Sequence, residues 1–495
     1  MTFAEETGAR AWKIGRLQSG SAPRVLELCS GCGGLSLGLK TAGFELVAHV
    51  EKDRVAAETY SRNFGDPDQR AGRWSLPRDM ENCSADDLVR DLGLEVTTDR
   101  AFDVLAAGLP CQAFARIGRS KLRAVAGKED AFRDDPRATL YLRFLEFVAA
   151  TDPLIIIIEN VPDILNFGGQ NVPEEICATL EEMGYHAAYT ILNSSYYGVP
   201  QIRERFFLVA FATELNIAPE FPEPTHFLRL PRGYEGSRQV ALKHVSPDSP
   251  RFRPIHEPAP GLLPAVGVEE ALHDLPFISE HLDKPQLLRR RRLKERLPYR
   301  HTESLTAYAS MMREWAGFET AGESDGHLVR LTPRDYAIFA KMPHGADYPK
   351  ARELAEQMLI EALHKQGLPI HDTDSPEYQK LRKAIVPPYD PSKFPNKWWK
   401  MDPAKPSRTL TAHMGKDTYS HIHYDSGQQR MVSVREAARL QSFPDGFSFE
   451  GEMNAAFRQI GNAVPPILGR EVAKSLRKQL LAALASTGTA ERQAA

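Results

Sequence analysis

Short apolar runs alternate with longer stretches of helical periodicity over the first two hundred residues of the chain. The runs are continuously apolar, which is typical of strands that are buried on both faces. Such runs, separated by helices, predict a parallel sheet of the α/β class. The predicted strands are residues 25–28, 47–50, 104–107, 154–158 and 206–210.

Residues suited to chemistry or ligand binding follow four of these strands directly. The glycine-rich residues 31–34 follow the first strand, and Glu51 follows the second. Cys111 lies beyond the third strand and Glu159 beyond the fourth. Ligands of parallel α/β sheets bind beyond the carboxyl ends of the strands. We therefore expect one crevice at this edge to collect all of these residues.

The turn at residues 27–34 reads Glu-Leu-Cys-Ser-Gly-Cys-Gly-Gly and leads into a predicted helix at 35–42. Glycines allow positive φ angles and close approach to a ligand, and Glu51 is spaced to bind a ribose hydroxyl pair. The pattern is not GxGxxG and no basic residue follows to hold phosphate, which favours S-adenosylmethionine over NAD. Two alternatives stay open. One is a purely structural turn, and the other is a redox pair or half of a zinc site at Cys29 and Cys32, although no second CxxC accompanies them. We expect no metal.

Cys111 lies in a Gly-Leu-Pro-Cys-Gln segment at the end of the third predicted strand. Pro110 stiffens the approach to it by fixing its own φ angle. A lone cysteine is commonly a small buried apolar residue, so its neighbours decide the interpretation. Glu159 directly follows an isoleucine run, where desolvation would raise its pKa and favour the protonated form. Gln-Ile-Arg-Glu-Arg at 201–205 supplies guanidinium groups near the same edge, with a surface salt-bridge pattern as the alternative.

Composition narrows the class of protein. The 495 residues are enough for two or three domains. The longest aliphatic run is far too short to cross a bilayer, and residues 1–15 lack the apolar stretch of a signal peptide. The five cysteines are too scattered for a disulfide framework, so we expect a soluble cytoplasmic protein. The net charge of −3 means that any DNA affinity must come from local basic groups.

Taken in order, these segments resemble the cytosine-C5 DNA methyltransferase family of the bacterial restriction-modification type. The resemblance rests on six blocks and on weaker echoes at residues 79–80 and 137–140. It implies a Rossmann-like S-adenosylmethionine-dependent methyltransferase sheet with an inserted smaller, irregular target-recognition domain. The six blocks are residues 27–34, 110–112, 159–161, 201–205, 434–445 and 461–465.

The resemblance also implies roles for four catalytic residues. Cys111 matches the thiolate that adds to C6 of the target cytosine. Glu159 matches the residue that hydrogen-bonds N3 and the exocyclic amine. Arg205 matches the arginine that contacts the base O2, and Arg203 the one that holds the carboxylate and loop in place.

S-adenosylmethionine is the implied cofactor. Asp79 and Met80 would frame its adenine and Glu51 its ribose, while residues 462–464 would close the pocket. The chain departs from the family at two positions: Cys29 replaces the usual aromatic residue, and Ala115 stands where serine is common. The full implied cofactor set is Cys29, Gly31, Gly33, Gly34, Glu51, Asp79, Met80, Pro110, Leu140, Asn462 and Val464.

Two basic segments are candidates for contact with double-stranded DNA. Residues 115–134 are polar and basic and follow Cys111, which favours a lid over the flipped base rather than only a solvated loop. Residues 286–300 form the most basic stretch, for which a solvated helix face is the alternative to phosphate contact. The expected DNA-binding residues are Gln112, Arg116, Arg119, Arg289, Arg290, Arg291 and Arg292.

We expect a catalytic domain at residues 1–212, a target-recognition domain at 213–452, a segment at 453–483 that completes the catalytic domain, and a disordered tail at 484–495. The enzyme would act as a monomer on DNA, with any restriction endonuclease or defence protein encoded separately. Two alternative functions are methylation of tRNA, whose enzymes tend to lack such a long middle region, and an inactive DNA-binding regulator. Inactive regulators of this kind usually lack the cysteine, the carboxylate or the cofactor loop, and all three are present here.

Overall fold

The computed structural model describes residues 8–65, 71–110, 136–231, 233–300, 303–415 and 419–494. The chain forms two compact units. The first unit comprises Met1–Gly198, Arg203–Pro264 and Ala463–Ala495, and the second comprises Val199–Ile202 and Ala265–Asn462. The segment from 213 to 264, which the sequence analysis assigns to the inserted domain, thus packs within the first unit.

A six-stranded sheet in the order β2-β1-β3-β4-β6-β5 forms the centre of the first unit. Strands β1 to β4 are mutually parallel, as predicted. The last predicted strand, β6, instead runs antiparallel to both β4 and β5, which corrects the expectation of a wholly parallel sheet. The sequence analysis missed β5. The strands are β1 (Arg24–Leu28), β2 (Glu45–Val50), β3 (Val104–Ala107), β4 (Ile155–Asn160), β5 (Tyr185–Asn193) and β6 (Glu204–Ala212).

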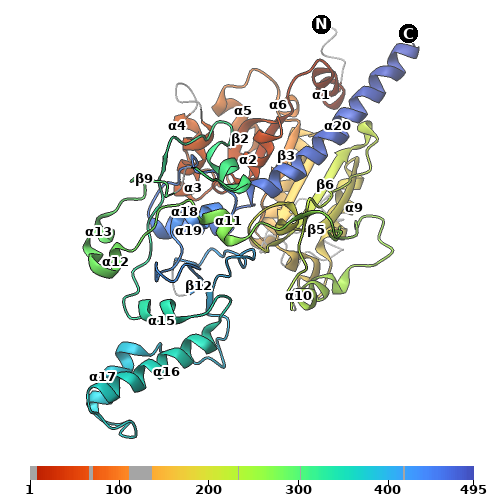
Figure 1. Ribbon diagram of the computed structural model, residues 1–495. Coiled ribbons are helices and arrows are strands. Elements are labelled where there is room, and N and C mark those ends of the chain that lie inside the picture. The colour runs from red at the N-terminus through yellow and green to blue at the C-terminus, as the bar shows by residue number, and fades with distance from the viewer. Residues whose placement is uncertain are drawn as a thin grey trace. The chain divides into compact units, whose positions relative to one another are not determined.

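Helices from both ends of the chain pack against this sheet (Figure 1). Helix α20 (Pro466–Ala494) contributes Leu468, Val472 and Leu476 to the same apolar core as the strands. Its backbone is helical as far as Ala494, whereas we expected a disordered tail from residue 484. The other α-helices of this unit are α1 (Ala9–Gln18), α2 (Gly34–Thr41), α3 (Arg54–Phe64), α4 (Ala71–Trp74), α5 (Ala85–Leu92), α6 (Thr98–Ala101), α8 (Pro136–Thr151), α9 (Val172–Glu182) and α10 (Tyr234–Ala241).

Short elements complete the first unit around the sheet. They are the 3-10 helices η2 (Pro162–Asn166), η3 (Ser194–Tyr197), η4 (Thr213–Leu215) and η5 (Leu242–His244), and the paired strands β7 (His226–Phe227) and β8 (Leu263–Pro264). None of the helices in the described ranges is both long and apolar enough to span a membrane.

Helices α2 and α20 approach each other so closely that only glycine fits at their contact. A Cβ atom on Gly38 would lie 2.4 Å from the backbone nitrogen of Arg470 and 2.5 Å from the carbonyl carbon of Gly469. Nearby, a Cβ atom on Gly34 would lie 2.2 Å from the carbonyl oxygen of Val464. The opposing atoms belong to the backbone and cannot rotate away, so the glycines set the distance between the two helices.

The second unit consists mostly of short helices and two-stranded pairs. Its longest helix, α16, has 18 residues and packs with α15 and β11 around a separate apolar core that includes Phe339, Leu359 and Trp398. The elements are α11 (Val268–Leu272), α12 (Glu280–Asp283), α13 (Pro285–Arg290), β9 (Leu297–Pro298), α14 (Ala307–Arg313), β10 (Glu323–Ser324), α15 (Tyr336–Lys341), α16 (Tyr348–Lys365), α17 (Pro376–Ile385), β11 (Trp398–Lys400), β12 (Tyr419–Ile422), α18 (Val434–Leu440) and α19 (Met453–Asn462).

The contact between α2 and α20 predicts the effect of a single methyl group. Gly38→Ala should lower the free energy of unfolding by about 2 kcal/mol or more, because the new methyl group overlaps backbone atoms of α20. Gly15→Ala in α1 is the matched control, since a Cβ atom there meets no atom within 4 Å. It should leave the stability unchanged or raise it by up to about 1 kcal/mol through helix propensity. Urea unfolding of both variants measures the difference, and equal effects would contradict the close contact.

Candidate active site

The reversed direction of β6 brings the candidate catalytic groups to one edge of the sheet. In the β4–β6 register, Glu159 is opposite Phe207 and Asn160 is opposite Phe206. The first residues of β6 therefore lie beside the last residues of β4. Had β6 been parallel to β4, Arg205 would start the strand at the opposite edge of the sheet, away from Glu159.

Glu159 and Arg205 form an ion pair at this edge, with 3.0 Å between Oε1 of the glutamate and Nε of the arginine. Their side chains are only 10% and 12% exposed. Burial raises the pKa of Glu159, and the positive charges of Arg205 and Arg203 offset only part of that rise. The carboxyl group therefore keeps its proton to a higher pH than an exposed glutamate does.

Arg203 links this edge to the C-terminal segment of the first unit. Its guanidinium is buried and donates from Nη2 to the carbonyl oxygen of Ala463 at 3.3 Å. Burial lowers the pKa of Arg203. Ala463 belongs to the 461–465 block, so two blocks that are far apart in the sequence meet here.

The chain that leads toward residue 111 is held beside Glu159. The Nδ2 atom of Asn160 donates to the carbonyl oxygen of Leu109 at 2.8 Å. A Cβ atom added to Gly108 would lie 4.0 Å from Oε2 of Glu159, which places the backbone at 108 next to the carboxyl group. Pro110 follows and is exposed. Four predicted site residues, Cys111, Gln112, Arg116 and Arg119, and the expected lid at 115–134, lie outside the described residues.

The cofactor loop adopts the positive φ angles that its glycines predict. Cys29, Gly31 and Gly33 have φ angles of 52°, 55° and 91°. The carboxylate of Glu51 accepts the N–H of Gly31 at 2.8 Å through one oxygen and the N–H of Asp53 at 2.7 Å through the other. Burial raises the pKa of Glu51, against these two hydrogen bonds, which lower it. Glu51 thus fixes the loop to the end of β2.

Space and polar groups at the loop fit S-adenosylmethionine. A Cβ atom on Gly31 would meet no atom within 4 Å, whereas one on Gly33 would lie 2.3 Å from the ring of Phe64. The backbone at Gly31 therefore has open space beside it, whereas the backbone at Gly33 packs directly against Phe64. Each oxygen of Glu51 has a second lone pair that can accept a hydroxyl group.

Other predicted cofactor residues lie in varied surroundings. Met80 is buried, and its carbonyl oxygen accepts from Nε of Arg143 at 3.2 Å. Asp79 accepts the N–H of Glu81 at 3.1 Å through Oδ1. Val464 is buried in the first unit beside Gly34, whereas Asn462 is exposed and belongs to the second unit. Leu140 is half-buried and packs against the core of the first unit.

The sequence analysis missed a buried histidine beneath the cofactor loop. His49 on β2 lies 2.9 Å from the hydroxyl of Ser30 through Nδ1 and 2.8 Å from the carbonyl oxygen of Trp74 through Nε2. A carbonyl oxygen only accepts, so Nε2 carries the proton and Nδ1 accepts from Ser30. Burial lowers the pKa of His49 to about 4, which keeps the ring neutral. The one sign of this group in the sequence is a histidine within a predicted apolar strand.

Glu27 is a second buried polar group that the sequence analysis did not interpret in this way. Burial raises the pKa of Glu27 to about 8. Ser36 donates to its carboxylate and lies 2.7 Å from the hydroxyl of Tyr60. Tyr60 stacks on His49 with 3.8 Å between ring centroids. Glu27 is thus part of the support for the loop.

Comparison with known proteins identifies the family. The model of the C-5 cytosine-specific DNA methylases matches residues 23–478. The chain belongs to this family. It is therefore a DNA cytosine-5-methyltransferase.

Two relatives resemble this methylase along nearly their full length. M.OihORF3336P of Oceanobacillus iheyensis, which carries the name of a type II methyltransferase, is 37% identical over 92% of this chain and 96% of its own. The type II methyltransferase M.AgeI of Thalassovita gelatinovora is 30% identical over 92% and 99%. The fold matches that of a prophage-encoded protein from E. coli described as a DNA modification methyltransferase, with a TM-score of 0.56 and 21% identity over 93% of this chain and 99% of that chain.

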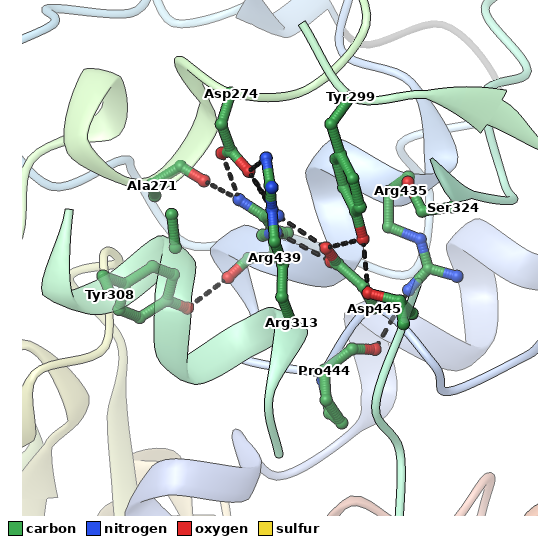
Figure 2. Close-up of polar contacts among 12 residues, drawn as sticks. Ala271, Asp274, Tyr299, Tyr308, Arg313, Ser324, Arg435, Arg439, Pro444 and Asp445 are labelled. Atoms are coloured by element: carbon green, nitrogen blue, oxygen red, sulfur yellow. Dashed lines mark hydrogen bonds and ion pairs between the residues drawn. The ribbon is translucent and has the colours of Figure 1, made fainter. Parts of the chain in front are cut away.

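In the methylase, the block at 434–445 forms a buried network of charges within the second unit (Figure 2). Arg439 on α18 pairs with Asp274 at 2.6 Å and with Asp445 at 2.5 Å. Arg313 pairs with the same Asp274 at 2.5 Å, and the hydroxyl of Tyr299 donates to Asp445 at 2.6 Å. Each of these buried charges has an opposite charge beside it, so removing one partner would leave an uncompensated charge inside the second unit.

The four consecutive arginines of the methylase have two different environments. Arg289, Arg290 and Arg292 are exposed, as phosphate contact requires. The side chain of Arg291 is only 7% exposed and pairs with Glu280 at 2.7 Å. Its Nη1 also donates to the carbonyl oxygen of His327 at 3.4 Å. The expectation for Arg291 is therefore corrected: this arginine holds the segment in place and is not free to bind phosphate.

The buried network predicts a large and pH-dependent loss of stability. Asp274→Asn should lower the free energy of unfolding by about 3–5 kcal/mol, because Arg313 and Arg439 lose a buried counter-charge. Burial alone would raise the pKa of Asp274, but Arg439 and Arg313 outweigh it and lower the pKa. The loss should therefore be full at neutral pH and shrink below about pH 4, where the unfolded chain already binds the proton.

The matched control for this prediction is Glu58→Gln. Its partner Arg54 has a side chain that is 79% exposed, so the change should cost less than about 0.5 kcal/mol. Denaturant unfolding at several pH values compares the two variants. A loss in Asp274→Asn as small as in the control would show that the network does not stabilise the second unit.

Proposed function

We propose that this methylase transfers a methyl group from S-adenosylmethionine to C5 of a cytosine that is flipped out of duplex DNA, with Cys111 as the nucleophile. The observation that supports this most directly is the buried Glu159–Arg205 pair beside the backbone that leads to residue 111. When Glu159 binds a proton, its carboxyl group and the guanidinium of Arg205 offer two adjacent donors. N3 and O2 are adjacent acceptors on cytosine.

Catalysis starts from a ring whose C5 is a weak nucleophile. The thiolate of Cys111 forms a bond to C6, and the ring electrons that this displaces make C5 nucleophilic. Glu159 hydrogen-bonds N3 and the amine while charge builds up there, and Arg205 binds O2. C5 then takes the methyl group, with S-adenosylhomocysteine as the leaving group. Afterwards C5 loses its proton to a base or to water, and the bond between C6 and sulfur breaks. The positive charges of Arg203 and Arg205 favour the thiolate over the thiol.

The loop at 29–34 and Glu51 would hold the cofactor, which supplies an electrophilic methyl group. Glu51, which already accepts the N–H of Gly31, would accept hydrogen bonds from the ribose hydroxyls, and Gly31 would allow the ligand to approach the backbone. Asp79 and Met80 would lie at the adenine. Val464, packed against Gly34, would keep the loop closed from the side of the C-terminal segment.

DNA affinity would come from local basic groups, because the net charge of the chain is −3. Arg289, Arg290 and Arg292 are exposed and suited to phosphate contact, and the second unit would read the target sequence. Both relatives described above carry the name of type II methyltransferases, which supports a role in restriction-modification. We further propose that the enzyme acts in the cytoplasm as a monomer on DNA, with a separately encoded endonuclease as its partner.

A transfer assay tests the reaction and its substrate. Purified enzyme and the Cys111→Ser variant are incubated with tritiated S-adenosylmethionine and either duplex DNA or total tRNA, and the DNA is then bisulfite-sequenced. We expect label in DNA at one sequence context, and none with the variant. Label in tRNA alone would show that the substrate is tRNA and not DNA. Equal label with the variant would exclude Cys111 as the nucleophile.

Glu159→Gln tests the role of the carboxyl group. It should lower kcat by about a hundredfold or more, because an amide cannot supply a proton to N3. Binding of S-adenosylhomocysteine, measured by calorimetry, should not change. Since burial raises the pKa of Glu159, wild-type kcat should decline as rising pH removes this proton, and the decline should be absent in the variant. A kcat within about twofold of wild type would remove Glu159 from the proposed mechanism.

A further inference from the structure

Helix α10 of the first unit (Figure 1) carries Arg238, whose side chain pairs with Glu204 at the start of β6. Nε of Arg238 donates to Oε1 of Glu204 at 2.9 Å, and Nη2 donates to the same oxygen at 2.5 Å. Arg238 also pairs through Nη1 with Glu257, whose other oxygen accepts from the hydroxyl of Tyr196 at 3.0 Å. The side chains of Arg238 and Glu204 are 12% and 11% exposed, whereas that of Glu257 is 58% exposed.

Glu204 lies between the two arginines of the active-site block and contacts one of them directly. Its backbone carbonyl oxygen accepts from Nη1 of Arg205 at 2.6 Å. Nε of the same guanidinium pairs with Glu159. The contacts thus form a chain from Arg238 to the side chain of Glu204, from the backbone of Glu204 to Arg205, and from Arg205 to Glu159.

Glu204 is the first residue of β6, so its placement decides where the strand begins. Pairing with the β5 side continues past this residue, since the N–H of Ser194 donates to the carbonyl oxygen of Arg203 at 2.9 Å. The pairing of Glu204 with Asn193 fixes the register of its backbone, but it does not set the direction of its side chain. The two bonds from the planar guanidinium of Arg238 to one carboxylate oxygen hold that side chain, and through it the residue that carries the carbonyl oxygen.

We propose that Arg238 is a positioning residue for methyl transfer. By holding Glu204, it fixes the carbonyl oxygen that orients the guanidinium of Arg205 toward the cytosine site. This inference rests on the proposed role of Arg205 and Glu159. It assigns a function to a helix outside the six sequence blocks, in the segment of the first unit that the sequence analysis placed in the inserted domain.

The competing explanation is an ion pair that only stabilises the fold, and kinetics separates the two. Arg238→Met should lower kcat by about tenfold, because small displacements of a catalytic group cost large factors in rate. The KM for S-adenosylmethionine should change by less than about twofold, since Arg238 does not touch the cofactor loop. Arg238→Lys keeps the charge but loses the second bond, so its kcat should lie between those of wild type and Arg238→Met.

The chain offers a matched control in Glu257→Gln, which disturbs the same arginine on the side away from Glu204. Its kcat should stay within about twofold of wild type, while thermal unfolding reports any loss of stability. If Arg238→Met fails to fold, Glu204→Gln replaces it, because this variant weakens the same clamp and keeps the backbone carbonyl. Equal loss of melting temperature in Arg238→Met and Glu257→Gln, with kcat unchanged in both, would overturn the proposal.

A double-mutant cycle with Arg205→Lys shows whether the effect passes through Arg205. If it does, the combined variant should lose less activity than the product of the two single losses. Independent, multiplicative losses would overturn the positioning role. Failure of the proposed function would give a different result. The single variant Arg205→Lys would then methylate DNA at the wild-type rate.

Discussion

The candidate active site of this methylase depends on the direction of a single strand. Because β6 runs antiparallel to β4, the residues that begin β6 lie beside the residues that end β4. Three features follow from this arrangement. Arg205 can pair with the buried Glu159, Arg203 can reach the carbonyl of Ala463, and Glu204 can be held by Arg238. A parallel β6 would separate all three contacts by the length of the strand.

Apolar periodicity predicted five of the six strands but not how the last of them runs. The runs in β1 to β4 are buried on both faces, so burial alone identifies them in the sequence. Strand direction depends instead on the length and path of the connection. The connection from β4 to β6 passes through β5, whose run Tyr-His-Ala-Ala-Tyr-Thr-Ile-Leu-Asn mixes polar and apolar residues and escaped detection. Without β5, a parallel β6 was the simpler expectation.

Contacts that join distant parts of the sequence were the least predictable part of the site. Glu51, Glu159 and the glycine loop were identified because each lies at the end of an apolar strand. His49 and Glu27 were not, since a buried polar residue is recognised by its partners and not by its neighbours in sequence. The same holds for Asp274 and Arg439, which pair across 165 positions. A run of four arginines likewise gives no sign that Arg291 alone is enclosed.

The glycine contact between α2 and α20 has a consequence for biosynthesis. Helix α20 supplies part of the core around the sheet, yet it follows the whole second unit in the chain. A ribosome therefore makes residues 265–462 before it makes the helix that completes the first unit. A nascent chain holds the sheet with one side of its core open until then, and such intermediates are the ones that chaperones protect. A chain cut short within the second unit consequently lacks the helix that contributes Leu468, Val472 and Leu476 to the core of the first unit.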